Sequence, residues 1–242
     1  MSELLEAYEA ERTDFERLIT AVRKVQAAPL EDLRSVDWVV EVIREIGLVP
    51  IPEAGRTYAA EAEYLNSSQQ GLIQIPTEYA RWLVLLSEQQ VKSYLEIGCF
   101  NGASATLAAA YLQRFEPEFR ATTIDIFPAF VFYSEIKDLV QLEYVVGKTS
   151  YEFREREFDA VFIDGDHSFE WAYADYENCG KDARICALHD VNNAPYRGLV
   201  MGGVPAVWEL IKACESSAEM VEIFEHPEGE DLLGIGVRIR KS

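Results

Sequence analysis

Short apolar runs alternate with longer mixed segments from residue 93 onward, and this alternation limits the architecture more than any other feature. The runs predicted to form strands are 93–97, 121–126, 144–146, 158–163, 185–188, 220–224 and 232–239. Segments of helical character lie between them at 103–115, 134–140, 169–178 and 204–213. Strands that alternate with helices predict right-handed crossovers and a mostly parallel, Rossmann-like α/β sheet of seven strands, covered on both faces. Residues 225–231 are too few for a crossover helix, so the last two strands are expected to pair antiparallel.

The first 70 residues have helical rather than alternating patterns. Apolar residues recur every three or four positions over 4–25, and a second helical stretch is predicted over 30–46, closing at Gly47. An extended connector follows at 49–52, and Thr77 is expected to cap a helix that runs to about residue 89. We therefore expect an N-terminal helical extension (1–70) on a catalytic domain (71–242).

Charge and cysteine content exclude several classes of function. The chain has 22 basic and 42 acidic residues, a net charge of −20, which would repel nucleic acid. No run approaches the roughly 20 apolar residues that span a bilayer, and the N-terminus has no secretory pattern. Its four cysteines form no CxxC pair, so neither a disulfide framework nor a zinc cluster is predicted. A soluble cytoplasmic protein is expected.

A glycine-containing turn follows the first predicted strand. In open α/β sheets ligands bind beyond the carboxyl ends of the strands. Gly98 and Gly102 allow a tight turn and the close approach of a ligand, and the next helix offers its amino end to a carboxylate or phosphate. Asp125 ends the second strand, 27 positions after Gly98, and is suited to accept hydrogen bonds from ribose hydroxyls. The spacing alone leaves S-adenosylmethionine and a dinucleotide as alternatives.

The run from about residue 73 to 240 resembles the class I methyltransferases. It is most similar to the small-molecule O-methyltransferases whose fourth strand ends in Asp-Gly-Asp-His, which is 164–167 here. The resemblance implies S-adenosylmethionine as cofactor, a glycine loop for its methionine part and Asp125 for its ribose. The cofactor-binding residues expected on this basis are Gln74, Glu96, Gly98, Phe100, Asn101, Gly102, Ser104, Asp125, Ile126 and Asp164.

Two departures from that family pattern stand out. Phe100 occupies the position between the loop glycines where a further glycine is often found. The Pro-Gly-Gly turn usual before the fifth strand is replaced by Lys-Asp-Ala-Arg at 181–184, which leaves the start of that strand less well defined.

Five ionisable residues cluster at the ends of the fourth and fifth strands: Asp164, Asp166, His167, His189 and Asp190. Carboxylates with an imidazole can hold Mg²⁺ or another divalent metal that lowers the pKa of an acceptor hydroxyl. The resemblance assigns the metal to Asp164, His189 and Asp190. Without a metal, His167 or His189 with an aspartate partner could act as general base, so Asp166, His167 and His189 are the catalytic candidates. The third interpretation gives these residues no chemical role: Asp-Gly-Asp at 164–166 forms a turn, and the two histidines cap the segments that follow.

We therefore predict an enzyme that transfers a methyl group from S-adenosylmethionine to an oxygen of a small molecule such as a sugar or polyketide. A nucleotide-dependent Rossmann enzyme is one alternative, although the chain lacks a G-x-G-x-x-G fingerprint. The other is a catalytically silent methyltransferase-like binding domain, against which the ionisable cluster argues. The N-terminal helices are predicted to cap the site or to form a homo-oligomer interface.

Overall fold

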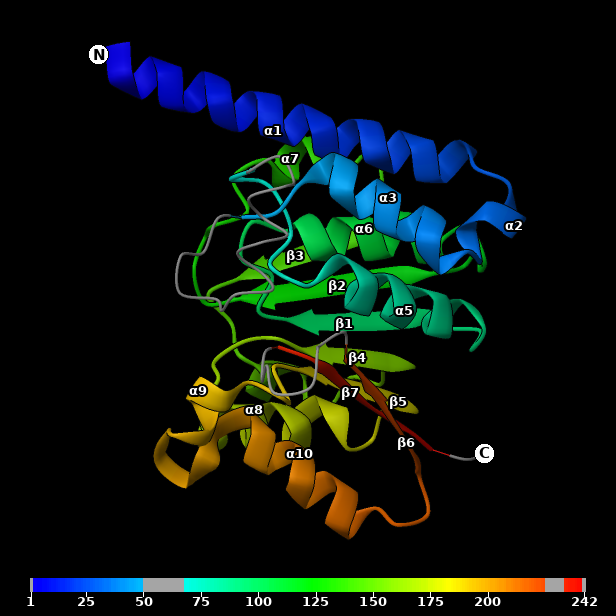
Figure 1. The fold of residues 1–242 in the computed structure, drawn as a ribbon, viewed down its shortest axis with the longest axis vertical. Coiled ribbons are helices and arrows are strands. Elements are labelled where there is room, and N and C mark those ends of the chain that lie inside the picture. The colour runs from blue at the N-terminus through cyan, green and yellow to red at the C-terminus, as the bar shows by residue number, and fades with distance from the viewer. Residues whose placement is uncertain (1, 50–67, 225–232, 241–242) are drawn as a thin grey trace.

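The computed structural model describes residues 2–49, 68–224 and 233–240. A seven-stranded sheet runs through the molecule in the order β3-β2-β1-β4-β5-β7-β6 (Figure 1). Its strands are β1 Ser93–Ile97, β2 Arg120–Asp125, β3 Leu142–Val146, β4 Ala160–Ile163, β5 Ile185–His189, β6 Glu219–Ile223 and β7 Ile235–Ile239. All pairs among β1 to β5 are parallel, whereas β7 pairs antiparallel with both β5 and β6. The predicted fold class and the antiparallel pairing of the last two strands are confirmed.

Helices cover both faces of the sheet (Figure 1). One hydrophobic core packs α1 Ser2–Ala27, α3 Val36–Ile46, α5 Pro76–Ser87 and α6 Ala103–Leu112 against one face. A second core packs α8 Phe169–Asp175 and α10 Gly203–Cys214 against the other. Shorter helices are α2 Leu30–Leu33, α7 Tyr133–Ile136 and α9 Ala194–Arg197. The helical extension therefore shares its core with the face of the sheet that α5 and α6 cover.

Several helix boundaries differ from the prediction: 103–115, 134–140 and 169–178 are shorter helices in the structure, and two further differences have a visible cause. The stretch 30–46 is interrupted at Ser35, whose backbone is extended (φ −87°, ψ 116°) and whose hydroxyl accepts a hydrogen bond from the Trp38 amide at the start of α3. Thr77 does not cap α5, because Ile75 is the N-cap residue and Pro76 occupies the first turn. Proline is favoured there because its missing amide would have no helical partner. Most of the connector predicted at 49–52, and the loop between β6 and β7, lie outside the described residues.

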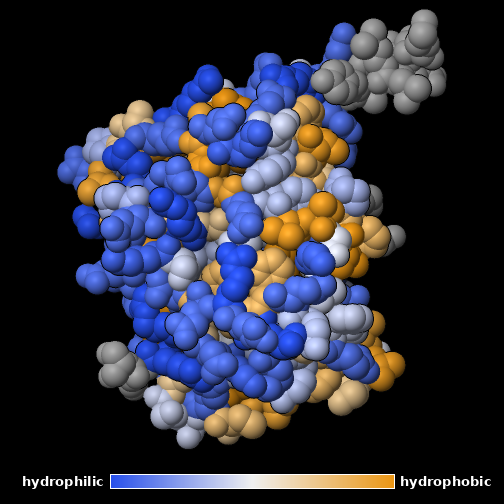
Figure 2. All heavy atoms as spheres, turned by 180° about the vertical axis from the view of Figure 1, so that it is seen from behind, coloured by the Kyte–Doolittle hydropathy of each residue, from blue (hydrophilic) through white to orange (hydrophobic). Residues whose placement is uncertain are grey.

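The surface agrees with the acidic composition. Seen from behind, hydrophilic side chains cover most of the molecule (Figure 2). Among the described residues, no helix is sufficiently long and apolar to cross a membrane.

A buried arginine explains how the chain manages without a Pro-Gly-Gly turn before β5. The guanidinium of Arg238 on β7 is fully buried and donates hydrogen bonds to the carbonyls of Gly180 (2.5 Å) and Ala183 (2.9 Å). Its Nε also lies 3.5 Å from a carboxylate oxygen of Glu215. Arg238 binds backbone carbonyls of the segment 180–183 and no side chain there, so this turn does not need the Pro-Gly-Gly sequence.

We expect Arg238→Met to lower the free energy of unfolding by about 3 kcal/mol, because the change leaves the buried carbonyls of Gly180 and Ala183 without their donor and removes one of the cations beside Glu215. Arg240→Met is the matched control, since Arg240 lies on the same strand but is partly exposed and 3.8 Å from Glu215. Urea unfolding followed by circular dichroism gives both values. Equal losses in the two variants would contradict this account of the turn.

Candidate active site

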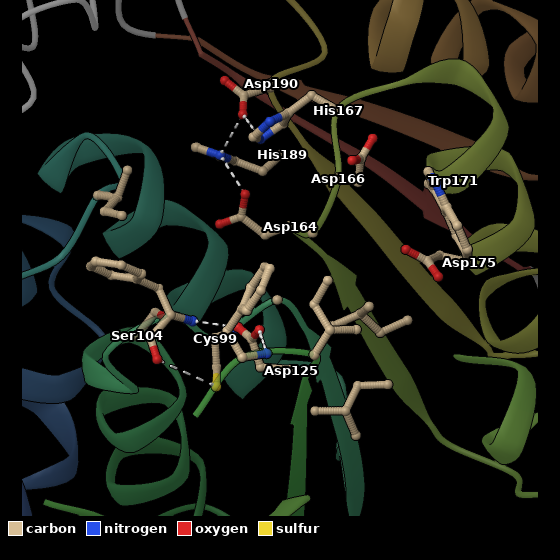
Figure 3. A pocket seen from close by; sticks show the side chains of 18 of the residues that line it. Cys99, Ser104, Asp125, Asp164, Asp166, His167, Trp171, Asp175, His189 and Asp190 are labelled. Atoms are coloured by element: carbon tan, nitrogen blue, oxygen red, sulfur yellow. Dashed lines mark hydrogen bonds and ion pairs between the residues drawn. The ribbon is translucent and has the colours of Figure 1, made fainter. Parts of the chain in front are cut away.

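A cleft of about 870 Å³ opens at the carboxyl ends of β1, β2, β4 and β5 (Figure 3). The strand order reverses here, because β1 pairs with β2 on one side and with β4 on the other. Such reversal points are where open α/β sheets bind ligands, and the volume is that of an ordinary small-molecule site.

The loop after β1 depends on left-handed backbone. Gly98 has φ +85°, and a Cβ atom at this position would lie 2.2 Å from the Asp164 carbonyl oxygen. Phe100 has φ +46° although it is not glycine, so the loop keeps its shape at the position where the family pattern has a glycine. The Phe100 side chain is about half exposed and lines the cleft. Gly102 (φ +82°) instead packs against the Phe130 ring.

The Asp125 carboxylate organises this same loop. One of its oxygens accepts hydrogen bonds from the amides of Cys99 (3.1 Å) and Phe100 (2.9 Å), and the other accepts from the amide of Phe127 (2.9 Å). A carboxylate offers about four acceptor positions, so these three amides leave it with capacity for a ligand hydroxyl. Asp125 therefore joins the ends of β1 and β2 in addition to facing the cleft.

Glu96 lies beneath the cleft, on the sheet face that α5 and α6 cover. It is fully buried and accepts hydrogen bonds from the hydroxyls of Ser104 (2.5 Å) and Tyr94 (2.9 Å). Burial raises the pKa of Glu96 to about 8, against the opposing effect of these two hydrogen bonds. Alternation along the strand explains the position, because Ile97 faces the cleft and Glu96 faces away.

The segment between the N-terminal extension and α5 forms one wall of the site. The Asn101 side-chain amide donates to the carbonyls of Gln69 (3.0 Å) and Gly71 (2.9 Å), and the Gln69 amide donates to Asp14 of α1 (2.8 Å). Downstream, the Gln74 amide donates to an Asp164 oxygen at 2.6 Å. The segment just before α5 thus supplies a residue that orients the end of β4.

The ends of β4 and β5 meet in a buried ionic cluster (Figure 3). Nδ1 of His189 lies 3.0 Å from Asp164 and 3.3 Å from Asp190. Burial opposes protonation of His189, but the charges of both aspartates outweigh it and raise its pKa well above the usual value. The pKa of Asp190 is lowered, because the charge of His189 and the hydrogen bond from His167 outweigh the effect of burial. The two carboxylates therefore favour the protonated form of His189.

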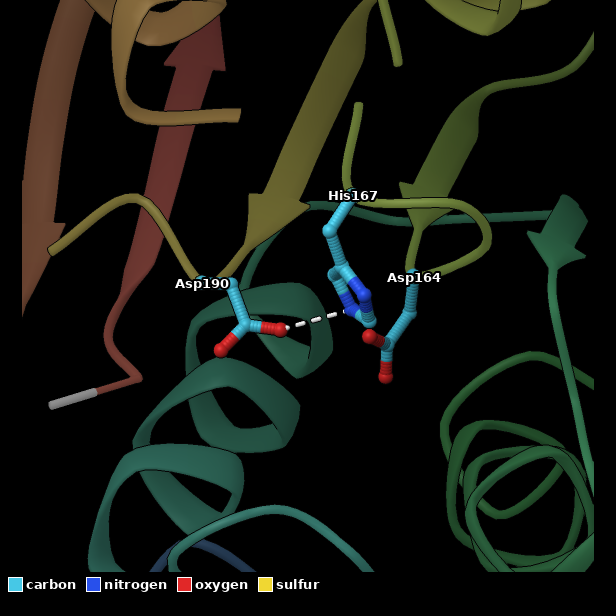
Figure 4. Close-up of side chains that lie close together, drawn as sticks. All are labelled: Asp164, His167 and Asp190. Atoms are coloured by element: carbon cyan, nitrogen blue, oxygen red, sulfur yellow. Dashed lines mark ion pairs between the residues drawn. The ribbon is translucent and has the colours of Figure 1, made fainter. Parts of the chain in front are cut away.

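His167 lies at the edge of this cluster, and its side chain is about one-third exposed (Figure 4). Its Nε2 is 2.9 Å from the Asp190 carboxylate, and its ring stacks on Tyr196 of α9 with centroids 4.4 Å apart. Burial works against protonation of His167, but the hydrogen bond and charge of Asp190 raise its pKa above the usual value. In the neutral ring this pairing leaves Nδ1 as the acceptor nitrogen.

Asp166 is exposed, and its carboxylate accepts a hydrogen bond from the Ser168 amide at 2.8 Å. That bond, with the Ser168 hydroxyl, lowers the pKa of Asp166. The second aspartate of Asp-Gly-Asp-His thus stabilises the turn that leads into α8.

The residues do not form a ready metal site as they are arranged here. Among the described residues, ligand atoms of Asp164, His167 and Asp190 converge within 4.8 Å, a set that has His167 in place of the expected His189. Both oxygens of Asp164 already face Gln74 and His189. Those of Asp190 face Asn193, His167 and His189. A cation would have to share these carboxylates with the protein groups that already contact them.

The structure brings most of the predicted site residues together around the cleft. The lining includes Gln74, Gly98, Phe100, Asn101, Ser104, Asp125, Ile126, Asp164, Asp166, His167, His189 and Asp190. Glu96 and Gly102 support it from behind. Sequence reasoning did not identify the lining residues Ser150, Trp171 and Asp175, because only the fold brings them to the cleft.

Comparison with known proteins places this geometry in context. Residues 95–185 match a family model described as a methyltransferase domain. The resemblance to methyltransferases predicted from the sequence is confirmed. The prediction of a methyltransferase is confirmed with it. No curated protein matches the chain.

Solved structures share the fold at low sequence identity. The O-methyltransferase from Bacillus cereus in complex with SAH superposes with a TM-score of 0.53 at 20% identity, covering 69% of this chain and 82% of that chain. The O-methyltransferase TomG from Streptomyces achromogenes, involved in tomaymycin synthesis and solved with SAM, gives 0.53 at 18% identity, covering 76% and 87%. The chain therefore shares its fold with these two O-methyltransferases.

We expect Gly98→Ala to destabilise the protein by more than about 2 kcal/mol, because the new methyl group would collide with the backbone at the end of β4. Gly147→Ala is the matched control. Its φ is +72°, but nothing lies within 4 Å of the added carbon, so it carries only the left-handed cost of roughly 1 kcal/mol. Thermal unfolding measures the loss of stability in each variant relative to the wild type. If the two losses are equal, the close approach of the β1 loop and β4 is refuted.

Glu96 also predicts a pH dependence of stability. Its pKa in the folded protein, about 8, exceeds the ordinary value of 4.5, so the folded state binds more protons between these limits. The contribution to the free energy of unfolding is fully present below pH 4.5 and falls by up to about 1.4 kcal/mol per pH unit toward pH 8. Denaturant titrations at pH 5 to 8 should show a weaker decline in Glu96→Gln than in the wild type. Parallel declines would contradict the raised pKa.

Proposed function

We propose that the protein transfers the methyl group of S-adenosylmethionine to a hydroxyl oxygen of a small molecule. The observation that carries this proposal is the pairing of His167 with Asp190 at the edge of the cleft, beside the loop after β1. A carboxylate that orients an imidazole through one nitrogen leaves the other to accept a proton, which is the arrangement of a general base.

The cofactor, when bound, supplies an activated methyl group on a sulfonium. The residues of the chain do the remaining work. The loop from Gly98 to Asn101 and the carboxylate of Asp125 bind the two ends of an amino-acid-linked ribose. His167 accepts the acceptor's hydroxyl proton at Nδ1, while Asp190 holds the ring and stabilises the imidazolium that forms. Tyr196 stacks on the ring and limits its rotation. The acceptor lies near His167, Asn193 and Tyr196.

Three carboxylates, Asp164, Asp166 and Asp190, surround this part of the cleft, and Lys148 is the one lysine or arginine in the described lining. Lys148 lies after β3, away from the cluster, and pairs with Glu152. An anionic acceptor would be repelled, so neutral or cationic hydroxyl compounds are the proposed substrate class.

We expect His167→Gln to lower kcat for methyl transfer about 10²- to 10³-fold, because proton removal from the acceptor loses its base. The dissociation constant for S-adenosylhomocysteine should stay within about threefold, since His167 does not hold the cofactor. The measurement uses [methyl-³H]-S-adenosylmethionine with a panel of neutral, cationic and anionic hydroxyl compounds. Glu155→Gln, on the exposed surface, is the control variant. Undiminished turnover in His167→Gln would refute the base.

Removal of metal ions by a chelator distinguishes a general-base mechanism from a metal-assisted one. Activity should survive EDTA, because the carboxylate oxygens of Asp164 and Asp190 already have protein partners. Loss of activity in EDTA with recovery on adding Mg²⁺ or Mn²⁺ would overturn the base role and place a cation on Asp164, His167 and Asp190.

A further inference from the structure

One buried carboxylate in the cleft, that of Asp175, has no part in the proton transfer proposed above. Asp175, in the last turn of α8, lines the cleft with only 5% of its surface exposed. Burial raises the pKa of this carboxyl to about 6, partly offset by the Ser150 hydroxyl. Among the described residues no cationic side chain forms an ion pair with it. An acid that is buried without a cation costs stability, so a hydrogen-bonding partner in the cleft would explain its presence.

The surroundings of Asp175 have the shape and chemistry of a heteroaromatic site. One of its oxygens lies 3.6 Å from the position a Cβ would take on Gly165, at the loop after β4. Trp171, one helical turn earlier on α8, lies beside it, and its indole is about half exposed (Figure 3). The apolar side chains of Ile97, Ile124 and Ile126 also line the cleft. A flat ring can lie on such apolar surfaces while its edge meets the carboxylate.

Ser150 connects this acid to the loop after β3. Its hydroxyl accepts a hydrogen bond from the Asn178 side chain at 3.0 Å, which leaves its own proton for Asp175. The adjoining residues Lys148 and Thr149 line the cleft as well. Asp175 therefore belongs to the side of the cleft next to the loop after β3. The His167 and Asp190 pair lies at the other side (Figure 3).

We propose that Asp175 is a specificity-determining residue that accepts a hydrogen bond from the exocyclic 6-amino group of the cofactor's purine. The inference rests on the proposed use of S-adenosylmethionine and adds which residue reads its base. A carboxylate accepts from an amino group but repels a carbonyl oxygen at the same place. The site thus selects a 6-aminopurine over a 6-oxopurine.

Calorimetry with two ligands tests this selection. S-adenosylhomocysteine carries the 6-amino group, and S-inosylhomocysteine carries an oxygen in its place. The wild type should bind the adenosyl compound about 10- to 100-fold more tightly, because a hydrogen bond to a charged group is lost and a repulsive contact replaces it. Asp175→Asn, whose amide can donate to the oxygen, should reduce that ratio at least tenfold. Glu170→Gln, on the exposed face of the same helix, should leave the ratio unchanged.

The outcomes separate this inference from the function on which it rests. If the wild type binds both compounds equally, or if Asp175→Asn keeps the wild-type ratio, Asp175 does not read the base and the inference is overturned. Should Asp175→Asn fail to fold, equal binding of the two compounds by the wild type still overturns the inference. If the wild type binds neither compound, the proposed function is overturned and the inference with it.

Discussion

The ionic contact of His189 with Asp164 and Asp190 is the interaction on which the rest of the site depends. It joins the ends of β4 and β5, two neighbouring strands that would otherwise present like charges to one another. Charges this deeply buried are tolerated only when they are paired and hydrogen-bonded, and removing one partner costs several kcal/mol. Gln74 and Asn193 complete the pairing from outside the sheet, so the cluster fixes both walls of the cleft.

The cleft has two chemically different sides, one polar and one apolar. At one side His167 and Asp190 form a polar edge suited to proton transfer, with Tyr196 stacked on the imidazole. At the other, isoleucine side chains and Trp171 form an apolar lining that contains the buried Asp175. The loop after β1 lies between them, and its left-handed residues bring it against the end of β4. One ligand that spans both environments would bring its reactive group to the polar edge.

The short apolar runs were enough to predict the sheet, because strands that are buried on both faces are made of consecutive apolar residues. The strand 93–97 has the predicted bounds, and the loop 225–231 correctly required antiparallel pairing. The break at Ser35 was missed because apolar periodicity continues across it. Thr77 was taken as a cap although Pro76 already set the start of α5.

The candidate site was predicted in part for the same reason. Residues at strand ends, such as Asp125 and Asp164, are identified by the sheet itself. Glu96 lies behind the cleft and accepts a hydrogen bond from the lining residue Ser104, so its part in binding the cofactor stays a prediction. Asp175 and Tyr196 come from helices, and their place in the cleft depends on how α8 and α9 pack against the sheet. No local pattern indicates that packing.

The central claim is that this cleft binds S-adenosylmethionine rather than a dinucleotide. Isothermal titration of the intact protein with S-adenosylhomocysteine and, separately, with NAD tests it most directly. We predict saturable binding of one S-adenosylhomocysteine per chain and no heat of binding with NAD. Binding of NAD, or of neither ligand, would contradict the account.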